Sequence, residues 1–150
     1  MLFRSKLLLP LVAGLLAFTF NARAELAWGT DLDAAVAKAK KEKKIVLVDF
    51  TGSDWCGWCI KLKKEVWDTK EFADYAKENV VLVELDFPRR TPQSAELQKA
   101  NARLQAKYRV DGFPTILALN GEGKEVWRNP GYLAGGPTAM IGKLNEARKK

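Results

Sequence analysis

After an apolar start, two kinds of hydrophobic pattern alternate along the chain. Five segments are predicted to be helices, most of them because apolar residues recur three or four positions apart. These segments are residues 30–44, 56–66, 70–79, 97–108 and 137–148. Short runs rich in β-branched and other apolar residues predict strands. The predicted strands are residues 45–50, 80–85, 115–119 and 124–128.

The order of these elements predicts the fold class. Strands that are separated by helices pair in parallel. The Asn120-Gly121 turn between the last two strands is a strong hairpin signal, which adds an antiparallel edge. We therefore expect one α/β domain, with a central mixed sheet and helices on both faces. No repeat, low-complexity tract or second domain interrupts the pattern.

The first 24 residues have the composition of a secretory leader. A basic start is followed by an apolar run that spans 14 residues, Leu7 to Phe20, and by small residues before a cut after Ala24. A helix that spans a bilayer needs about 20 apolar residues. We therefore expect a signal peptide at residues 1–24, export to the periplasm or the medium, and a mature domain of residues 25–150. A membrane anchor formed by an uncleaved signal is the alternative.

The charge of the chain argues against one class of partner. The sequence has 25 basic residues, 18 acidic residues and no histidine. Three of the basic residues fall in the leader, which leaves a net charge of +4 for the mature domain. An excess of this size, spread over several short runs, is typical of a solvated surface. We expect no nucleic-acid partner.

Both cysteines of the chain lie in one motif, DWCGWC, at residues 54–59. A disulfide between Cys56 and Cys59 would close too short a loop to stabilise the fold much. A structural zinc site needs about four ligands, and two cysteines without histidine do not supply them. The motif therefore favours redox chemistry without a metal, and a purely structural pair is the alternative.

The position of the motif favours a reactive thiol at Cys56. This residue follows a predicted strand and opens a predicted helix, where unpaired backbone N–H groups and the helix dipole favour a thiolate. Free cysteine has a pKa of about 8.5, and such sites lower it to roughly 3.5–7.5. Cys59 lies one turn deeper. We therefore expect Cys56 to attack and Cys59 to resolve.

Two segments carry a family resemblance: VDFTGSDWCGWC at residues 48–59 and GFPT at residues 112–115. With the hairpin that follows, they resemble the thioredoxin superfamily, and TGSDWCGWC is similar to its exported bacterial thioredoxin-like branch. The resemblance covers the chain from about Leu26 onward. It implies a thioredoxin fold and a thiol–disulfide oxidoreductase that needs no organic cofactor. It also implies a cis Phe113–Pro114 bond beside the sulfurs, which leaves the Phe113 backbone free to pair with an extended client.

Asp49 is the expected proton carrier. It interrupts an apolar strand, and burial would raise the pKa of its carboxyl, which suits proton exchange with the resolving thiol. Thioredoxins carry an aspartate at this position, usually one residue closer to the first cysteine. A strand-end carboxylate that reaches solvent is the alternative. Glu84 falls where thioredoxins often carry a lysine, and a second acid there would raise the pKa of Asp49 further.

Aromatic residues near the motif predict a surface that binds clients. We expect Trp58 to shield one face of the disulfide and to contact client chains. For Trp67 and Trp127 we expect core packing. The expected client-binding residues are Trp55, Gly57, Trp58, Phe113 and Pro114.

Together these features predict an exported, monomeric enzyme that exchanges its CGWC dithiol or disulfide with client proteins. Strongly oxidising members of the superfamily carry a histidine between the cysteines, and this chain has none. We therefore expect a reductase or isomerase rather than a strong oxidase, recharged by a membrane electron donor of the thiol–disulfide interchange type. The alternative is a binding module or chaperone of the same fold with little redox turnover.

Overall fold

A computed structural model describes residues 26–150, and the predicted leader lies outside these residues. A five-stranded sheet forms the centre of the fold, in the order β1-β3-β2-β4-β5. β1, β3 and β2 run parallel, whereas β4 is antiparallel to both β2 and β5. The sheet is therefore mixed, as the sequence predicts. Its strands are β1 (Trp28–Gly29), β2 (Ile45–Thr51), β3 (Val80–Asp86), β4 (Thr115–Leu119) and β5 (Glu125–Pro130).

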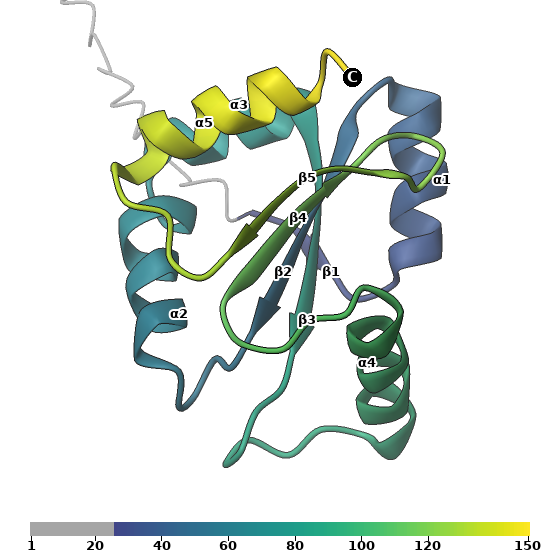
Figure 1. Ribbon diagram of the computed structural model, residues 1–150, viewed down its shortest axis with the longest axis vertical. Coiled ribbons are helices and arrows are strands. Elements are labelled where there is room, and N and C mark those ends of the chain that lie inside the picture. The colour runs from purple at the N-terminus through teal and green to yellow at the C-terminus, as the bar shows by residue number, and fades with distance from the viewer. Residues whose placement is uncertain (1–25) are drawn as a thin grey trace, which may run out of the picture.

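Helices cover both faces of this sheet (Figure 1). One face carries α1 (Leu32–Glu42) and α4 (Ala95–Lys107), which pack on a cluster that includes Val46 and Val48 of β2. The other face carries α2 (Gly57–Leu62), α3 (Lys70–Asn79) and α5 (Gly136–Ala147), which pack on a cluster that includes Ile45 and Leu47. Alternate residues of β2 thus enter opposite cores, because side chains alternate across a strand. Within residues 26–150, no helix has the length and apolar composition needed to cross a bilayer.

Two local differences from the sequence pattern have clear causes. α1 ends at Glu42, earlier than the predicted residue 44, because Lys43 adopts a left-handed conformation with φ of 56°. The N–H of Lys43 bonds to carbonyl groups of the last helical turn, which closes the helix. The sequence pattern does not predict β1, because this strand is only 2 residues long.

The helix that begins after the cysteines changes geometry before it ends. α2 continues as a π-helical turn, η1 (Lys63–Trp67), closed by the N–H of Asp68 on the carbonyl of Lys63 at 2.8 Å. Thr69 then caps α3, which agrees with the predicted break near residues 67–69. The wider turn directs two successive side chains, Val66 and Trp67, into the core. It thereby brings Trp67 onto the face of the sheet that carries Asp49.

Candidate active site

The two cysteines lie where the central strand β2 ends and α2 begins. Cys56 is the N-cap residue of α2, and its sulfur accepts the backbone N–H of Cys59 at 3.2 Å. The two residues form a disulfide, and their Cα atoms lie 5.2 Å apart. Cys56 is 7% exposed and Cys59 is 3% exposed. Cys56 is therefore the slightly more exposed residue of the two, and it sits at the positive end of a helix.

The loop before Cys56 is fastened to the segment that follows β3. The carboxylate of Asp54 accepts the backbone N–H groups of Arg89, Arg90 and Thr91 at 2.9, 2.8 and 2.7 Å. These hydrogen bonds, with that of Arg89 the largest cause, hold the pKa of Asp54 below its usual range. Asp54 therefore remains an anion at working pH and joins the two loops.

The indole of Trp55 is fixed by the same two loops. Its Nε1–H donates to the carbonyl of Phe87 at 2.8 Å, and the guanidinium carbon of Arg89 lies 3.6 Å from the ring centroid. Phe113 packs edge-on against the indole, with ring centroids 6.0 Å apart. A Cβ at Gly52 would lie 2.5–2.8 Å from indole atoms, so only glycine allows the ring this close. Trp55 thus forms a rigid wall next to Cys56.

Most of the residues expected to bind clients meet in one groove. Trp58 stands 58% exposed at its edge and packs on Tyr132 with ring centroids 5.4 Å apart. The Phe113–Pro114 peptide bond is cis. Gly57, by contrast, is exposed at the start of α2 and lies outside the groove lining. The groove is lined by Trp58, Phe113, Pro114, Gly131 and Tyr132.

Asp49 lies on the face of β2 that α2 covers, and it is only 3% exposed. The pKa of Asp49 is raised to about 7, mainly by burial and in smaller part by the negative charges of Glu84 and Asp86. The Nε1–H of Trp67 donates to Oδ2 of Asp49 at 2.9 Å and opposes the rise. Oδ1 of Asp49 has no hydrogen-bond partner among residues 26–150. Asp49 is therefore a buried acid that titrates near neutral pH, not a strand-end carboxylate in solvent.

Glu84 stands next to Asp49 on the neighbouring strand. The two residues are partners in the parallel register of β2 and β3, so their side chains leave the sheet on the same face. Burial also raises the pKa of Glu84, and Asp86 adds to the rise, whereas Lys63 lowers it. The pair therefore favours the protonated form of each carboxyl.

Sequence reasoning missed some of the residues that shape this site. Trp67 does pack in the core as expected, but it also bonds to Asp49. A usable signal existed, because a buried indole N–H needs an acceptor. Arg89 and Tyr132 come from loops far from the motif, and only the folded arrangement brings them close. Asp54 stood within the motif, but its partners are backbone groups that carry no sequence signal.

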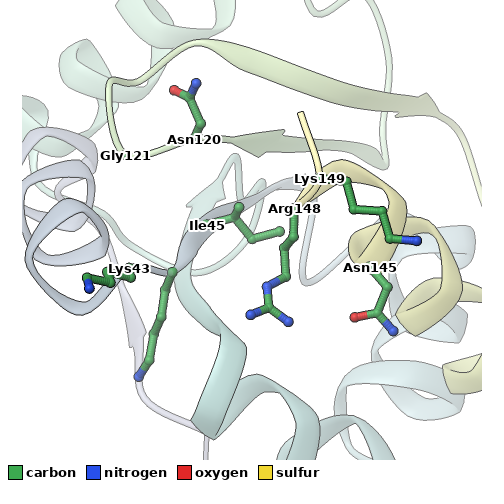
Figure 2. A pocket seen from close by; sticks show the side chains of 8 residues that line it. Lys43, Ile45, Asn120, Gly121, Asn145, Arg148 and Lys149 are labelled. Carbon is green, nitrogen blue, oxygen red and sulfur yellow. The ribbon is translucent and has the colours of Figure 1, made fainter.

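A larger hollow lies at the opposite end of the sheet (Figure 2). It is formed around Ile45, the first residue of β2, whereas the cysteines follow the last residue of that strand. Lys43 and Lys149 extend toward opposite sides of its opening, so the basic groups do not converge on one point. Both cysteines of the chain lie at the other end of the sheet.

Comparison with known proteins identifies the family. The model of the thioredoxin-like domain matches residues 32–147. The chain belongs to the thioredoxin-like family. Membership confirms the predicted fold. The relatives described next confirm the predicted class of enzyme, a thiol–disulfide oxidoreductase.

Several curated proteins are similar to this thioredoxin-like chain. The disulfide bond reductase DsbH of Chlamydia pneumoniae is 37% identical over 128 residues, which cover 85% of this chain and 76% of that protein. The thioredoxin-related protein DsbJ of the same organism is 32% identical over 69% of this chain and 30% of its own length. The thiol:disulfide interchange protein DsbD of Vibrio cholerae is 33% identical over 72% of this chain, but over only 17% of itself.

Solved structures agree with this assignment. A structure described as DsbH oxidoreductase superposes with a TM-score of 0.77 at 36% identity, covering 84% of this chain and 86% of that one. A thioredoxin from Thermus thermophilus superposes with a TM-score of 0.58 at 21% identity, covering 81% of this chain and 86% of that one. At that identity the second similarity supports the fold alone.

Proposed function

We propose that this thioredoxin-like protein exchanges disulfides with client proteins outside the cytoplasm and acts there as a reductase or isomerase. The observation that carries the proposal is the place of the Cys56 sulfur. It caps the start of α2, accepts the N–H of Cys59 and belongs to the more exposed of the two cysteine residues. After reduction, such a position stabilises a thiolate, which is the attacking form. Similarity to a protein named disulfide bond reductase supports the direction.

The reaction proceeds in two exchanges. The Cys56 thiolate attacks one sulfur of a client disulfide, so that a Cys56–client disulfide forms and the other client sulfur leaves as a thiolate. The Cys59 thiolate then attacks the sulfur of Cys56. The Cys56–Cys59 disulfide forms again, and the second client sulfur leaves. Two electrons pass to the client, and its two thiolates take up protons. A dithiol donor, for which we propose a membrane protein of the interchange type, returns the enzyme to the reduced state.

Asp49 takes the proton from Cys59 in the second exchange. Its carboxyl is buried on the α2 side of the sheet, and its pKa of about 7 allows both protonated and ionised forms near neutral pH. A general base works best when its pKa is close to the working pH. The free Oδ1 leaves one oxygen of the carboxyl available for the proton while Oδ2 stays on Trp67.

Clients bind along the groove of Trp58, Phe113 and Pro114, with Trp55 as the wall beside Cys56 and Gly57 leaving the helix start open. Pro114 uses its own carbonyl to bond to the N–H of Gly131 at 2.7 Å. The Phe113 backbone next to it is the group we assign to an extended client strand. The leader at residues 1–24 accounts for export, and an uncleaved leader would keep the same domain at the membrane.

A binding module or chaperone is the second candidate, and one observation favours it. Among residues 26–150, the exposed large hydrophobic side chains are Trp58 and Ile60, at 58% and 50%. Both lie on α2, and Trp58 lines the groove, so this part of the surface could hold an unfolded chain without any exchange of disulfides.

A trapping experiment separates these two functions. Reduced Cys59→Ser protein is mixed with a disulfide-containing client, and the products are separated under non-reducing conditions. An oxidoreductase forms a covalent Cys56–client adduct, because the resolving thiol is missing. The control is the double variant Cys56→Ser with Cys59→Ser, which keeps the groove and forms no adduct. A client that binds both variants equally without an adduct would favour the binding module.

Two further measurements assign the thiol roles and the direction. Alkylation of the reduced protein at mildly acidic pH is expected to label Cys56 before Cys59. Equilibration with glutathione is expected to give a potential nearer to the roughly −270 mV of thioredoxin than to the roughly −120 mV of strong oxidants. Preferential labelling of Cys59 would contradict the roles. A strongly oxidising potential would contradict the direction.

A further inference from the structure

Arg89 is held in one place beside the redox motif. Its backbone N–H donates to Asp54, two residues before Cys56, at 2.9 Å. Its guanidinium packs on the Trp55 indole, and the guanidinium carbon lies 3.6 Å from the ring centroid. The indole itself is fixed by its hydrogen bond to Phe87. Both ends of the arginine are therefore anchored to the residues that precede the attacking sulfur.

The guanidinium of Arg89 is nevertheless free of a carboxylate. It is exposed, and within the described part of the chain neither Arg89 nor Arg90 forms an ion pair. Asp54 lies on the same loops, but its oxygens are engaged by three backbone N–H groups. A guanidinium on an aromatic face keeps its edge N–H donors available. This edge presents a fork that matches a carboxylate.

The opposite rim of the site differs in this respect. Lys61 lies 5.4 and 5.3 Å from the ring centroids of Trp58 and Tyr132, but its ammonium is 3.9 Å from the carboxylate of Glu65. Glu65 in turn accepts the hydroxyl of Tyr132. The positive charge of Lys61 is therefore offset by the negative charge of Glu65. The guanidinium that stacks on Trp55, next to Cys56, thus carries a charge that no carboxylate offsets.

We propose that Arg89 is a specificity-determining residue, which selects clients that carry an aspartate or glutamate beside the reactive cysteine. The inference rests on the proposed exchange function and names the substrate class for it. An ordinary surface arginine loses side-chain freedom when it binds a carboxylate. Arg89 has already lost most of that freedom by stacking on Trp55, so more of the ion-pair energy is retained on binding.

The test compares synthetic disulfide peptides that differ only in the residues flanking the cysteine, which are glutamate, glutamine or lysine. The rate of the first exchange with reduced protein is measured by stopped-flow tryptophan fluorescence at low salt. Each rate is divided by the rate with dithiothreitol, an uncharged dithiol, to remove the intrinsic reactivity of the peptide. We expect the glutamate peptide to react about fivefold faster than the glutamine peptide, the effect of a well-oriented exposed ion pair. This preference should fall in 0.5 M salt.

Three variants define the source of the preference. Arg89→Gln is expected to reduce the glutamate-to-glutamine ratio to about one. Arg89→Glu should invert the selection, so that the lysine peptide reacts faster than the glutamate peptide. The matched control, Arg148→Gln, removes an exposed arginine at the other end of the sheet (Figure 2) and should leave the fivefold ratio unchanged. If Arg89→Gln does not fold, Arg89→Lys replaces it, because it keeps the charge but loses the fork, and the ratio should fall by about half.

The outcomes separate the role of Arg89 from the proposed exchange function on which it rests. Equal normalised rates for all peptides with the wild-type protein, or a ratio that persists in Arg89→Gln, would overturn the role of Arg89 while the exchange function stands. No reaction with any peptide would overturn the exchange function itself and this inference with it. A ratio lost equally in Arg148→Gln would assign the preference to net charge and overturn the role of Arg89.

Discussion

Two aspartates stand on either side of the strand-to-helix junction, and the fold gives them opposite properties. Asp49 is buried in β2, and burial raises the pKa of its carboxyl to about 7. Asp54, five positions along, lies in the loop before Cys56, and three backbone N–H groups hold its pKa below the usual range. The same side chain is thus suited to carry a proton at one position and to remain a fixed anion at the other.

The difference shows what decides the charge of a carboxyl near a redox site. Both aspartates accept hydrogen bonds, since Asp49 accepts the indole N–H of Trp67. One bond to a buried carboxylate does not compensate for lost hydration, whereas three bonds to a half-exposed carboxylate exceed that loss. The number of hydrogen-bond donors, weighed against burial, therefore decides whether the carboxyl is protonated or ionised. Each substitution below removes one of these carboxyls, a donor to one of them or a neighbouring charge.

The largest effect is expected for Asp49→Asn. Raising the pKa from the ordinary 3.8 to about 7 means that ionised Asp49 costs the native state about 4 kcal/mol above pH 7. Asparagine keeps an acceptor for Trp67 and removes the charge. We expect the variant to be more stable than wild type by about 4 kcal/mol at pH 8, by about 2 kcal/mol at pH 5, and by little below pH 4.

The pH profile follows from the direction of the shift. Below the unfolded pKa of Asp49 both states are protonated, and the carboxyl costs nothing. As the pH rises toward the folded pKa, only the unfolded state ionises, so wild type loses stability relative to the variant. Urea midpoints and slopes at pH 4, 5 and 8 measure the difference. A difference that is the same at all three values would mean that Asp49 is not perturbed.

The next effect is expected for Trp67→Phe, which removes the donor to Asp49 and leaves an aromatic ring in place. Loss of a hydrogen bond to a buried, mostly ionised carboxyl costs about 1–3 kcal/mol at pH 8. Since the bond lowers the pKa of Asp49, that pKa should rise above 7 in the variant. Carboxyl NMR titration of Asp49 measures the shift. The control is Trp127→Phe, which shortens a half-buried indole elsewhere and should leave the titration of Asp49 unchanged.

Asp54→Asn is expected to loosen the segment that follows β3 rather than to change how the stability depends on pH. An amide offers one oxygen, so at least one of the three backbone donors of Arg89, Arg90 and Thr91 loses its acceptor. We expect these amides to exchange hydrogen at least about tenfold faster. The Ser53 amide, which bonds to Asp86 at 2.9 Å, serves as the internal control.

The pH dependence separates the two aspartates. A carboxyl with a lowered pKa contributes stability that is present above its unfolded pKa and is lost only as the pH falls through its folded pKa. The difference in stability between Asp54→Asn and wild type should therefore be constant from pH 5 to pH 8. A difference that changes over that range would mean that Asp54 titrates there and is not a fixed anion.

The layers of the fold could be predicted because the buried apolar residues recur with one spacing in helices and with another in strands. β2 and β3 are mostly apolar runs, and the Asn120-Gly121 turn marks the β4–β5 hairpin. The π-helical turn of η1 had no such signal, because its extra residue per turn resembles an ordinary break in a helical pattern. That turn places Trp67, so the need of its indole N–H for an acceptor did not by itself point to Asp49.

The site could be predicted only where its residues adjoin the motif. Cys56 and Cys59 follow from spacing, and the position of Pro114 follows from the family resemblance. The contacts of Asp54 depend on where the loop after β3 lies, and they are made with backbone N–H groups that any residue other than proline offers. Arg89 could be placed over Trp55 only once those contacts were known.

The smallest effect is expected for Glu84→Gln, which removes a negative charge next to Asp49 without changing the burial of Asp49. The charge of Glu84 raises the pKa of Asp49 less than burial does, so in the variant that pKa should fall below 7 and stay well above 3.8. At pH 7 about half of the Asp49 carboxyls are ionised in wild type, because the pKa is about 7. Full ionisation can therefore at most double a step that needs the base, and we expect the resolving exchange to accelerate by less than about twofold at pH 7.

The same reasoning gives the control conditions for this variant. At pH 8 most of the Asp49 carboxyls are ionised in both proteins, so the two resolving rates should converge. The rate is measured as release of client thiol from a preformed mixed disulfide on Cys56, by stopped flow from pH 5 to pH 8. Glu96→Gln removes an exposed acid from the first turn of α4 and should leave the profile unchanged. A slower resolving step in Glu84→Gln would mean that Glu84 itself carries the proton, with Asp49 acting only on its charge.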